Sequence, residues 1–346
     1  MEIGGETSKN HILFIKVSHS SFINADEKLL RNHFPVDTYF YGTDKGFKAG
    51  IAIIKMMMFL LLNIRKYALI YIWFADYHSL VPSLFSYLFR KKTIIVLGGF
   101  DVAKIPNLKY GAHTKKMRSL FVKASCYFAD GLIAVSQFVK DEAIINIGTQ
   151  ILSKIIVIYN AIDVESYVNT HQDRNNQVLC ISAAQDMNRA YIKGIDRFVN
   201  LAQQMPNYNF VLVGVTDPIL MDKLGINKVK NIECFSFMKK KDLLQMYNIS
   251  KVIFQLSIVE SFGLAVVEAM SCGCVPVVAN VGGLREIVDQ DFGYKVDRMD
   301  DKQIQTSIIQ VFNTFITKSQ LAQRTVLNRF SIKEREKKIL DFISDL

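Results

Sequence analysis

In the first part of the chain, short apolar runs alternate with longer segments whose apolar residues recur with a helical period. The runs are rich in consecutive Ile, Val and Leu, which is typical of parallel strands buried on both faces. Helical patterns, for example at 26–33 and 82–89, separate the runs and predict a parallel sheet covered by helices. The predicted strands are residues 11–17, 37–41, 69–73, 93–97, 131–135 and 154–158.

The same alternation starts again after a polar segment. Residues 169–177 read NTHQDRNNQ and break the periodicity, so we place a domain linker there. We expect an α/β protein with a first Rossmann-like domain at 1–170, a second at 178–328 and a final amphipathic helix within 329–346. Such doubly wound sheets bind ligands at the carboxyl ends of their strands. The predicted strands of the second domain are residues 178–182, 210–214, 231–235, 252–256 and 275–279.

Composition fits a folded protein of this size. The chain has 346 residues, of which 50% are apolar and 21% charged, enough for two domain cores. Its start is polar and lacks a secretory segment, so we expect a cytoplasmic location. The longest apolar stretch, residues 49–62, is interrupted by Lys55 and is too short to cross a bilayer. We interpret it as a buried helix beside the sheet, with an interfacial helix as the alternative.

The cysteines and the charge narrow the class of protein further. Five scattered cysteines fit reduced thiols, and we read Cys272 and Cys274 as small apolar packing residues.

The net charge is +10, and residues 90–123 hold nine basic side chains against one acid, Asp101. No recognisable nucleic-acid-binding motif accompanies them, so nucleic acid is not an expected partner. We expect instead peripheral contact with an anionic membrane, or with a lipid-diphosphate acceptor. A solvated basic face is the alternative.

Candidate chemistry is concentrated at residues 256–288, which read LSIVESFGLAVVEAMSCGCVPVVANVGGLREIV. Glu260 and Glu268 stand eight positions apart around Phe262, Gly263 and Leu264. Gly263 lets the backbone approach a ligand, and the free N–H groups of a helix that starts there favour an anion. A carboxylate, an anion-binding helix start and a second carboxylate match the sugar, diphosphate and ribose of a nucleotide sugar. The segment therefore predicts a donor site for such a molecule.

The spacing E-x7-E, followed by EAM-x-x-G-x-P-V-V and GG-x-x-E-I-V, resembles the retaining glycosyltransferases of GT-B fold in glycosyltransferase family 4. The resemblance is densest from residue 193 to 293. It implies that a sugar passes, with retention of configuration, from a UDP- or GDP-sugar to a hydroxyl of a glycan or lipid-linked acceptor. The expected context is surface polysaccharide biosynthesis at the inner face of the plasma membrane. The resemblance also implies a final helix that crosses back to the first domain.

The resemblance assigns roles to individual residues. Glu268 would hold the ribose diol, and Glu260 would position the donor sugar and stabilise charge near the reacting carbon. Lys193 and Arg189 would neutralise the departing diphosphate, which needs fixed positive charge. Phe262, Gly263 and Leu264 would supply backbone contacts. The alternatives are a solvated helix-start acid for Glu268 and a surface-loop residue for Arg189.

Metal ions and other cofactors are not expected, because donor sites of this fold use basic residues and helix starts. A formal D-x-D at residues 289–291 follows a helix and is read as chance.

The first domain departs from the family pattern. Ser18 and the residues after it replace a Gly-Gly loop, and Gly98-Gly99-Phe100-Asp101 stands where relatives often have a histidine. Gly98 and Gly99 would let the backbone approach the donor, and Asp101 would orient a hydroxyl. A tight turn with a capping Asp is the alternative. His78 follows a strand end and could face the crevice or be structural. These departures keep two other functions open, a nucleotide-sugar epimerase and a non-catalytic nucleotide-sugar-binding protein.

Overall fold

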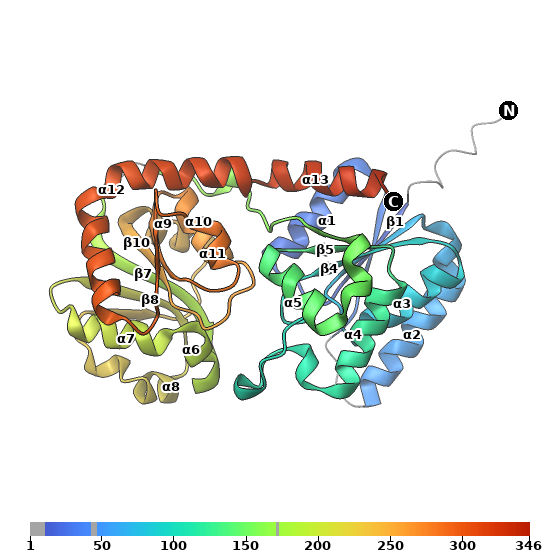
Figure 1. Cartoon of the computed structure of the whole chain (residues 1–346), viewed down its shortest axis with the longest axis horizontal. Helices are drawn as coiled ribbons and strands as arrows, with labels where there is room; N and C mark the ends of the chain where they lie inside the picture. The colour runs from blue at the N-terminus through green and yellow to red at the C-terminus, as the bar shows by residue number, and fades with distance from the viewer. Residues whose placement is uncertain (1–10, 43–46, 171–172) are drawn as a thin grey trace. The chain divides into compact units, whose positions relative to one another are not determined.

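A computed structural model describes residues 11–42, 47–170 and 173–346 and divides the chain into two compact units (Figure 1). The first unit comprises Met1–Asn160 with Arg335–Leu346, and the second comprises Ala161–Glu334. The chain thus enters the second unit several residues before the segment predicted as a linker. Residues 175–177 of that segment belong to a strand of the second unit.

The first unit contains a parallel sheet with the strand order β2-β1-β3-β4-β5-β6. All six predicted strands are confirmed, and their ends differ from the prediction by at most one residue. Most of the strand residues are buried on both faces, which explains their continuous apolar runs. The strands are β1 (Ile12–Lys16), β2 (Val36–Phe40), β3 (Leu69–Trp73), β4 (Lys92–Leu97), β5 (Gly131–Ala134) and β6 (Ile155–Val157).

Helices cover both faces of this sheet. Figure 1 shows α1 and α13 on one face and α2, α3 and α4 on the other. Two helices begin five residues before their predicted starts. Helix α3 begins at Tyr77 because Asp76 forms a capping box with Ser79, and helix α1 begins at Ser21. The helices are α1 (Ser21–His33), α2 (Phe47–Asn63), α3 (Tyr77–Leu88), α4 (Lys116–Phe128), α5 (Gln137–Ile147) and α13 (Ile332–Ser344).

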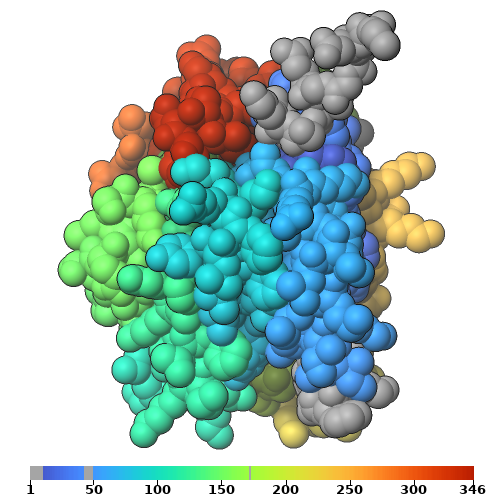
Figure 2. Space-filling model, turned by 90° about the vertical axis from the view of Figure 1, so that its right-hand side faces the viewer, coloured from blue at the N-terminus to red at the C-terminus, as the bar shows by residue number. Residues whose placement is uncertain are grey.

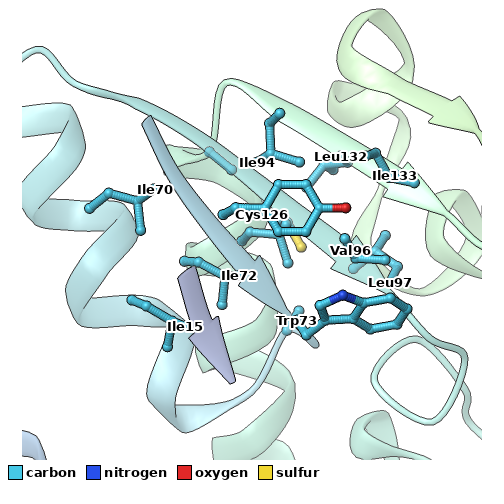
Figure 3. Close-up of a cluster of buried hydrophobic side chains, with 14 of the residues drawn as sticks. Ile15, Ile70, Ile72, Trp73, Ile94, Val96, Leu97, Cys126, Leu132 and Ile133 are labelled. Carbon is cyan, nitrogen blue, oxygen red and sulfur yellow. The ribbon is translucent and has the colours of Figure 1, made fainter. Parts of the chain in front are cut away.

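The core of the first unit is built from the branched side chains of its central strands. Figure 3 shows Ile15, Ile72, Ile94 and Val96 grouped near Trp73, from strands β1, β3 and β4. Each of these side chains is buried. Their packing fixes the strand ends at which the first unit's candidate residues stand.

A buried ion pair joins α13 to this unit. The guanidinium of Arg335 donates to both carboxylate oxygens of Asp26 in α1, at 2.6 and 2.7 Å. Tyr71 and Trp73 of β3 also donate to Asp26, at 2.9 and 3.0 Å. Arg335 further donates to the carbonyl oxygens of Ile158 and Tyr159, so all charged atoms of the pair have hydrogen-bond partners. Residues 335–346 therefore complete the first unit.

Helix α2 differs from its prediction. Its inward residues Met56 and Leu60 are buried, as expected for a helix beside a sheet. Its outward residues are nevertheless apolar and exposed, with Met58 at 59%, Leu61 at 59% and Leu62 at 82%. The prediction of a buried helix is therefore wrong for the outward face, because an apolar run does not show which of its sides is covered. Across residues 11–42, 47–170 and 173–346, no helix has both the length and the apolar content for crossing a membrane.

The second unit contains another parallel sheet, in the order β12-β11-β10-β7-β8-β9. The five predicted strands are confirmed. The sixth, β12, was not predicted because its three residues, Tyr-Lys-Val, form no continuous apolar run. The order reverses between β7 and β10, so their carboxyl ends form the switch point at which such sheets bind ligands. The strands are β7 (Asn175–Ala184), β8 (Asn209–Val215), β9 (Ile232–Phe235), β10 (Ser250–Gln255), β11 (Val275–Ala279) and β12 (Tyr294–Val296).

The helices of the second unit include one long kinked helix, α12, whose backbone leaves helical geometry at Thr314. Cys272 and Cys274 are buried between α10 and β11, as predicted for packing residues. The helices are α6 (Met187–Lys193), α7 (Ile195–Gln204), α8 (Pro218–Lys223), α9 (Lys240–Ile249), α10 (Leu264–Ser271), α11 (Leu284–Ile287) and α12 (Asp301–Arg329).

Candidate functional site

The carboxyl ends of β7 and β10 hold two loops against each other. The amide of Ile258, after β10, donates to the carbonyl oxygen of Ile192 in α6 at 2.8 Å. Gly194 ends α6 with a positive φ of 74°, and a Cβ there would lie 2.2 Å from the carbonyl oxygen of Leu256. Only glycine permits this approach without a clash. The contact places Lys193 beside the loop that carries Glu260.

Lys193 and Glu260 form an ion pair at this switch point. The Lys193 Nζ lies 2.7 Å from Glu260 Oε2, and Gln255 at the end of β10 donates to the same oxygen at 3.0 Å. The side chains of Lys193 and Glu260 retain 23% and 14% of their exposure. Both charges are thus held in place while remaining within reach of a ligand. The structure brings these two predicted residues together.

The turn after Glu260 is supported by the two glycines that follow β11. The amide of Gly283 donates to the Glu260 carbonyl oxygen at 2.8 Å. Gly282 has a φ of 49°, and a Cβ there would lie 2.2 Å from the same oxygen. The Gly-Gly pair therefore packs directly beneath the acidic loop, where a side chain would displace it.

Helix α10 begins immediately after this turn. Gly263 adopts a φ of 107°, and Leu264 is the first helical residue. The amides of Val266 and Val267 donate back to the Gly263 carbonyl. The amides that precede them at the start of α10 lie in the part of a helix where N–H groups can bind an anionic ligand. The Phe262 side chain is buried and makes an edge contact with Phe330 at 5.5 Å. Phe262 can therefore offer its backbone but not its ring.

Glu268 lies one turn into α10 and is held by two tyrosines. Tyr167 donates to its Oε1 and Tyr247 to its Oε2, each at 2.9 Å. Burial raises the pKa of Glu268, while the two tyrosine hydroxyls and Lys240 act in the opposite direction. A carboxylate offers about four acceptor positions, so one on each oxygen remains for a ligand's hydroxyls. The carboxylate is thus fixed in orientation with capacity to accept more hydrogen bonds.

Arg189 also lies on α6, in an exposed position. Its backbone amide donates to the Asp186 carboxylate that caps the helix, at 2.8 Å. It stands one helical turn before Lys193, so the two lie on neighbouring turns of one short helix. A role for Arg189 toward a diphosphate stays a prediction.

The predicted residues of the first unit are engaged within their own loops. Asp101 accepts from the amides of Ala75, Gly98 and Gly99 at 3.1, 3.1 and 2.7 Å. Its burial raises its pKa to about 6. A Cβ on Gly98 would lie 2.1 Å from the Phe74 ring, so the space above that glycine is filled. These are the contacts of a tight turn capped by an Asp.

His78 lies in α3 and is buried. Its Nε2 is 3.0 Å from the Trp73 carbonyl oxygen, and burial lowers its pKa. Its ring lies 5.6 Å from that of Tyr41. The structure thus gives His78 partners inside the first unit.

Three residues of the site escaped the sequence analysis. Tyr167 precedes the second sheet, 101 positions before Glu268, and Tyr247 lies in α9, 21 positions before it. Neither spacing belongs to a local pattern that would connect the tyrosines with Glu268. Gln255 had a detectable signal, since it is a buried polar residue that ends an apolar strand. Polar side chains at the carboxyl end of a parallel strand are candidates for the site.

The D-x-D segment at residues 289–291 has a local role. The Asp289 carboxylate accepts from the amide of Gln290 at 2.6 Å, and its carbonyl oxygen accepts from Gly293 at 2.8 Å. Within residues 11–42, 47–170 and 173–346, no group of three or more His, Cys, Asp or Glu side chains is arranged to hold a metal ion.

Comparison with known proteins shows what the second unit is similar to. Residues 164–325 match the family described as Glycosyl transferases group 1. The structure is similar to Anabaena Alr3699/HepE in complex with UDP-glucose, with a TM-score of 0.76, 19% identity and coverage of 97% of this chain and 100% of that chain. The fold is therefore GT-B, with two Rossmann-like domains.

Curated relatives match over part of their length. An uncharacterized glycosyltransferase of Methanocaldococcus jannaschii is 26% identical over 234 residues, which is 64% of this chain and 58% of the relative. An uncharacterized 42.6 kDa protein in the cps region of Klebsiella pneumoniae is 26% identical over 164 residues, 46% of this chain and 40% of the relative. The chain thus spans about half the length of the curated relatives that it matches.

Proposed function

We propose that this protein is a retaining glycosyltransferase that moves a hexosyl group from a UDP- or GDP-sugar to a hydroxyl of a glycan or lipid-linked acceptor. The observation that carries the proposal is the Lys193–Glu260 pair at the carboxyl ends of β7 and β10, beside the start of α10. The cation and the helix start suit a diphosphate, and the carboxylate between them suits the hydroxyls of the attached sugar. The match of residues 164–325 to the family described as Glycosyl transferases group 1, which covers these residues, supports the proposal.

Each site residue has a chemical task in this proposal. The amides at the start of α10 and the Lys193 ammonium bind the diphosphate. Glu268, oriented by Tyr167 and Tyr247, accepts hydrogen bonds from the ribose hydroxyls. Glu260 accepts from the donor sugar's hydroxyls and keeps Lys193 in position before the donor binds. Arg189 adds a second positive charge on α6.

Lys193 contributes most when the diphosphate leaves. The bond between the sugar's anomeric carbon and the β-phosphate oxygen breaks, and negative charge accumulates on that phosphate. A preorganised ammonium stabilises this charge without reorganisation. The acceptor hydroxyl attacks from the same face and transfers its proton to the departing phosphate oxygen, so the configuration is retained. Neither a metal ion nor another cofactor takes part in this proposal.

The acceptor and the pathway are proposed on chemical context. The relative described as an uncharacterized protein in the cps region of Klebsiella pneumoniae favours surface polysaccharide biosynthesis. A lipid-linked acceptor would carry diphosphate charge of its own, which the basic first unit would attract. The proposed place of action is the cytoplasmic face of the plasma membrane.

Thermal-shift measurements with UDP, GDP, ADP and the corresponding nucleotide sugars test the donor site. A ligand at about 100 times its dissociation constant stabilises the folded form by about 2.7 kcal/mol, which is easily detected. We expect a shift with one base, loss of that shift in Lys193→Ala, and no loss in Lys223→Ala, an exposed lysine on α8. If no nucleotide produces a shift, or if Lys193→Ala responds as the unaltered protein does, the proposed site is wrong.

Turnover separates the proposal from its rivals. Incubation with donor and an acceptor panel, followed by NMR of the product, reports transfer and anomeric configuration. Conversion of donor alone into another sugar would identify an epimerase instead. Nucleotide binding without turnover on any acceptor, with Glu260→Ala unchanged in every assay, would indicate a binding protein.

A further inference from the structure

Three helices on one face of the first unit lack acidic residues. The segments 47–66, 77–92 and 115–129, which contain α2, α3 and α4, have eleven Lys and Arg residues and no Asp or Glu. Surface helices ordinarily carry both signs of charge on their outer faces. Figure 2 shows the outer surfaces of these helices side by side, with α2 in blue, α3 in cyan and α4 in green. We call this surface the α2–α4 face.

Apolar side chains project from the same surface. On α2, the outward residues Ile54, Met58, Leu61 and Leu62 are all exposed, and Lys55 stands among them. The opposite side of α2 is packed into the core through Met56 and Leu60. An exposed helix normally presents polar residues outward, so α2 has an apolar face that the first unit leaves uncovered.

The neighbouring helices extend this pattern. At their carboxyl ends, Tyr87 and Leu88 of α3 and Tyr127 of α4 are exposed. The ends of α2 and α3 are neighbours, since Lys91 donates to the Arg65 carbonyl just after α2 at 3.3 Å. The ends of α3 and α4 are also neighbours, since the rings of Tyr87 and Phe128 lie 5.3 Å apart. The exposed basic residues of the α2–α4 face are Lys55, Arg65, Lys66, Arg90, Lys92, Lys115, Lys116 and Lys123. Two of them pair with acids outside the three helices, Lys66 with Asp37 at 2.5 Å and Lys92 with Asp130 at 3.5 Å.

We infer that the α2–α4 face docks on an anionic lipid bilayer, with α2 lying in the interface. Leu, Ile and Met side chains would enter the boundary between headgroups and acyl chains, as in interfacial helices. The lysines and arginines would face anionic headgroups, and the tyrosines would stand at headgroup level. The absence of acidic residues in these helices is the charge complementarity that selects this occupant.

The basic charge of residues 90–123 alone would also fit a solvated surface. The apolar outward side of α2, which lies outside 90–123, distinguishes a surface that inserts from one that is merely basic. Docking does not depend on the donor site, because the two involve different units of the chain.

Vesicle flotation tests the inference. The full chain, without nucleotide, is mixed with neutral phosphatidylcholine vesicles or with vesicles that contain phosphatidylglycerol. We expect flotation with the anionic vesicles, reduced in high salt because the Debye length falls to about 3 Å at 1 M. Leu61→Ser/Leu62→Ser and Lys116→Glu/Lys123→Glu should each weaken binding about tenfold or more.

Matched controls lie on the second unit. Ile316→Ser/Leu327→Ser removes two α12 side chains of similar exposure, 73% and 56%, and Lys223→Glu/Lys228→Glu reverses two exposed lysines. Both should float as the unaltered protein does. Circular dichroism and the nucleotide-induced thermal shift establish that each variant folds.

Three results would overturn the inference. One is no flotation with anionic vesicles. Another is unchanged flotation of Leu61→Ser/Leu62→Ser. The third is a dimer in light scattering that this variant dissociates, which would make the α2–α4 face a contact between copies of the chain. A failed nucleotide shift together with normal flotation would contradict the proposed function and leave this inference standing.

Discussion

Glu268 shows how a residue's surroundings can serve its chemistry. Tyr167 and Tyr247 each donate to one of its oxygens, and burial raises its pKa. A ligand hydroxyl needs the ionised carboxylate as acceptor. The tyrosines favour that form, because a hydrogen bond to the charged group lowers its pKa. They therefore widen the pH range in which Glu268 can accept hydrogen bonds from a ligand's hydroxyls.

Replacing Tyr247 with Phe should raise the pKa of Glu268 further. The proposed donor affinity declines as pH falls through that pKa, so in Tyr247→Phe the decline should begin at a higher pH. Loss of a hydrogen bond to a charged group also lowers the free energy of unfolding by about 1.5–3 kcal/mol. Calorimetric titration with the nucleotide across pH measures the first effect, and urea denaturation measures the second.

Tyr208→Phe is the matched control, since the Tyr208 ring stacks on Phe312 and the two tyrosines that donate to Glu268 are Tyr167 and Tyr247. Its pH profile should equal that of the unaltered protein. An identical profile in Tyr247→Phe would show that Tyr247 does not tune the carboxylate.

Asp101 gives a second prediction at the residue scale. Burial raises its pKa from 3.8 to about 6. Between these values the folded protein binds more protons at this site than the unfolded chain does. The contribution of Asp101 to the free energy of unfolding is therefore greatest at low pH and falls by about 3 kcal/mol as pH rises through that window. Well above pH 6, this contribution should no longer change with pH.

Asp101→Asn removes this titration. Its free energy of unfolding, measured by urea denaturation from pH 4 to 7, should fall less with pH than that of the unaltered protein. The variant should also be less stable near pH 4, because an amide nitrogen cannot accept the backbone hydrogen bonds. Parallel pH profiles of the two proteins would refute the assignment.

At the scale of elements, the loop after β10 depends on the glycines that follow β11. The sequence motif predicted an acidic pair around a helix start, and the structure confirms that helix. The motif could not show that Gly282 packs against the Glu260 carbonyl, because that contact joins two loops that are distant in the sequence. Likewise, the tyrosines that hold Glu268 come from separate segments. Strand β12 reads Tyr-Lys-Val and therefore lacks the continuous apolar run that revealed the other strands.

Gly282→Ala should destabilise the second unit by about 1–3 kcal/mol, through strain at a positive φ and the clash with Glu260. Because the clash displaces the acidic loop, nucleotide-induced stabilisation should also be lost. Gly225→Ala is the control: its φ is 73° but a Cβ there meets no atom within 4 Å. This variant should lose stability only through backbone strain, and the nucleotide should still stabilise it. Equal losses in the two variants would show that the loop contact is unimportant.

For the whole molecule, sequence periodicity predicted both parallel sheets and eleven of the strands to within a few residues. This success has a physical reason, since strands buried on both faces must be continuously apolar. The same reasoning failed for α2, whose outer face is apolar without being covered by the unit. The unit boundary also fell earlier than the polar segment suggested, because β7 begins inside that segment.

The ion pair between Asp26 and Arg335 should stabilise mainly the first unit. Arg335→Ala leaves a buried carboxylate without its cation, which costs about 3–5 kcal/mol. Hydrogen exchange should show lost protection in residues 12–160 and little change in 175–330. The control Lys333→Ala breaks an exposed pair with Glu165 and should change stability by less than about 1 kcal/mol. Protection lost evenly over both units would contradict this prediction.

The partners in that ion pair stand 309 positions apart in the chain. On the ribosome, Asp26, Tyr71 and Trp73 emerge long before the cation that they surround. A nascent first unit therefore holds an uncompensated acid in its interior until residue 335 emerges. Premature termination before residue 335 would release the first unit without the cation that its buried carboxylate needs.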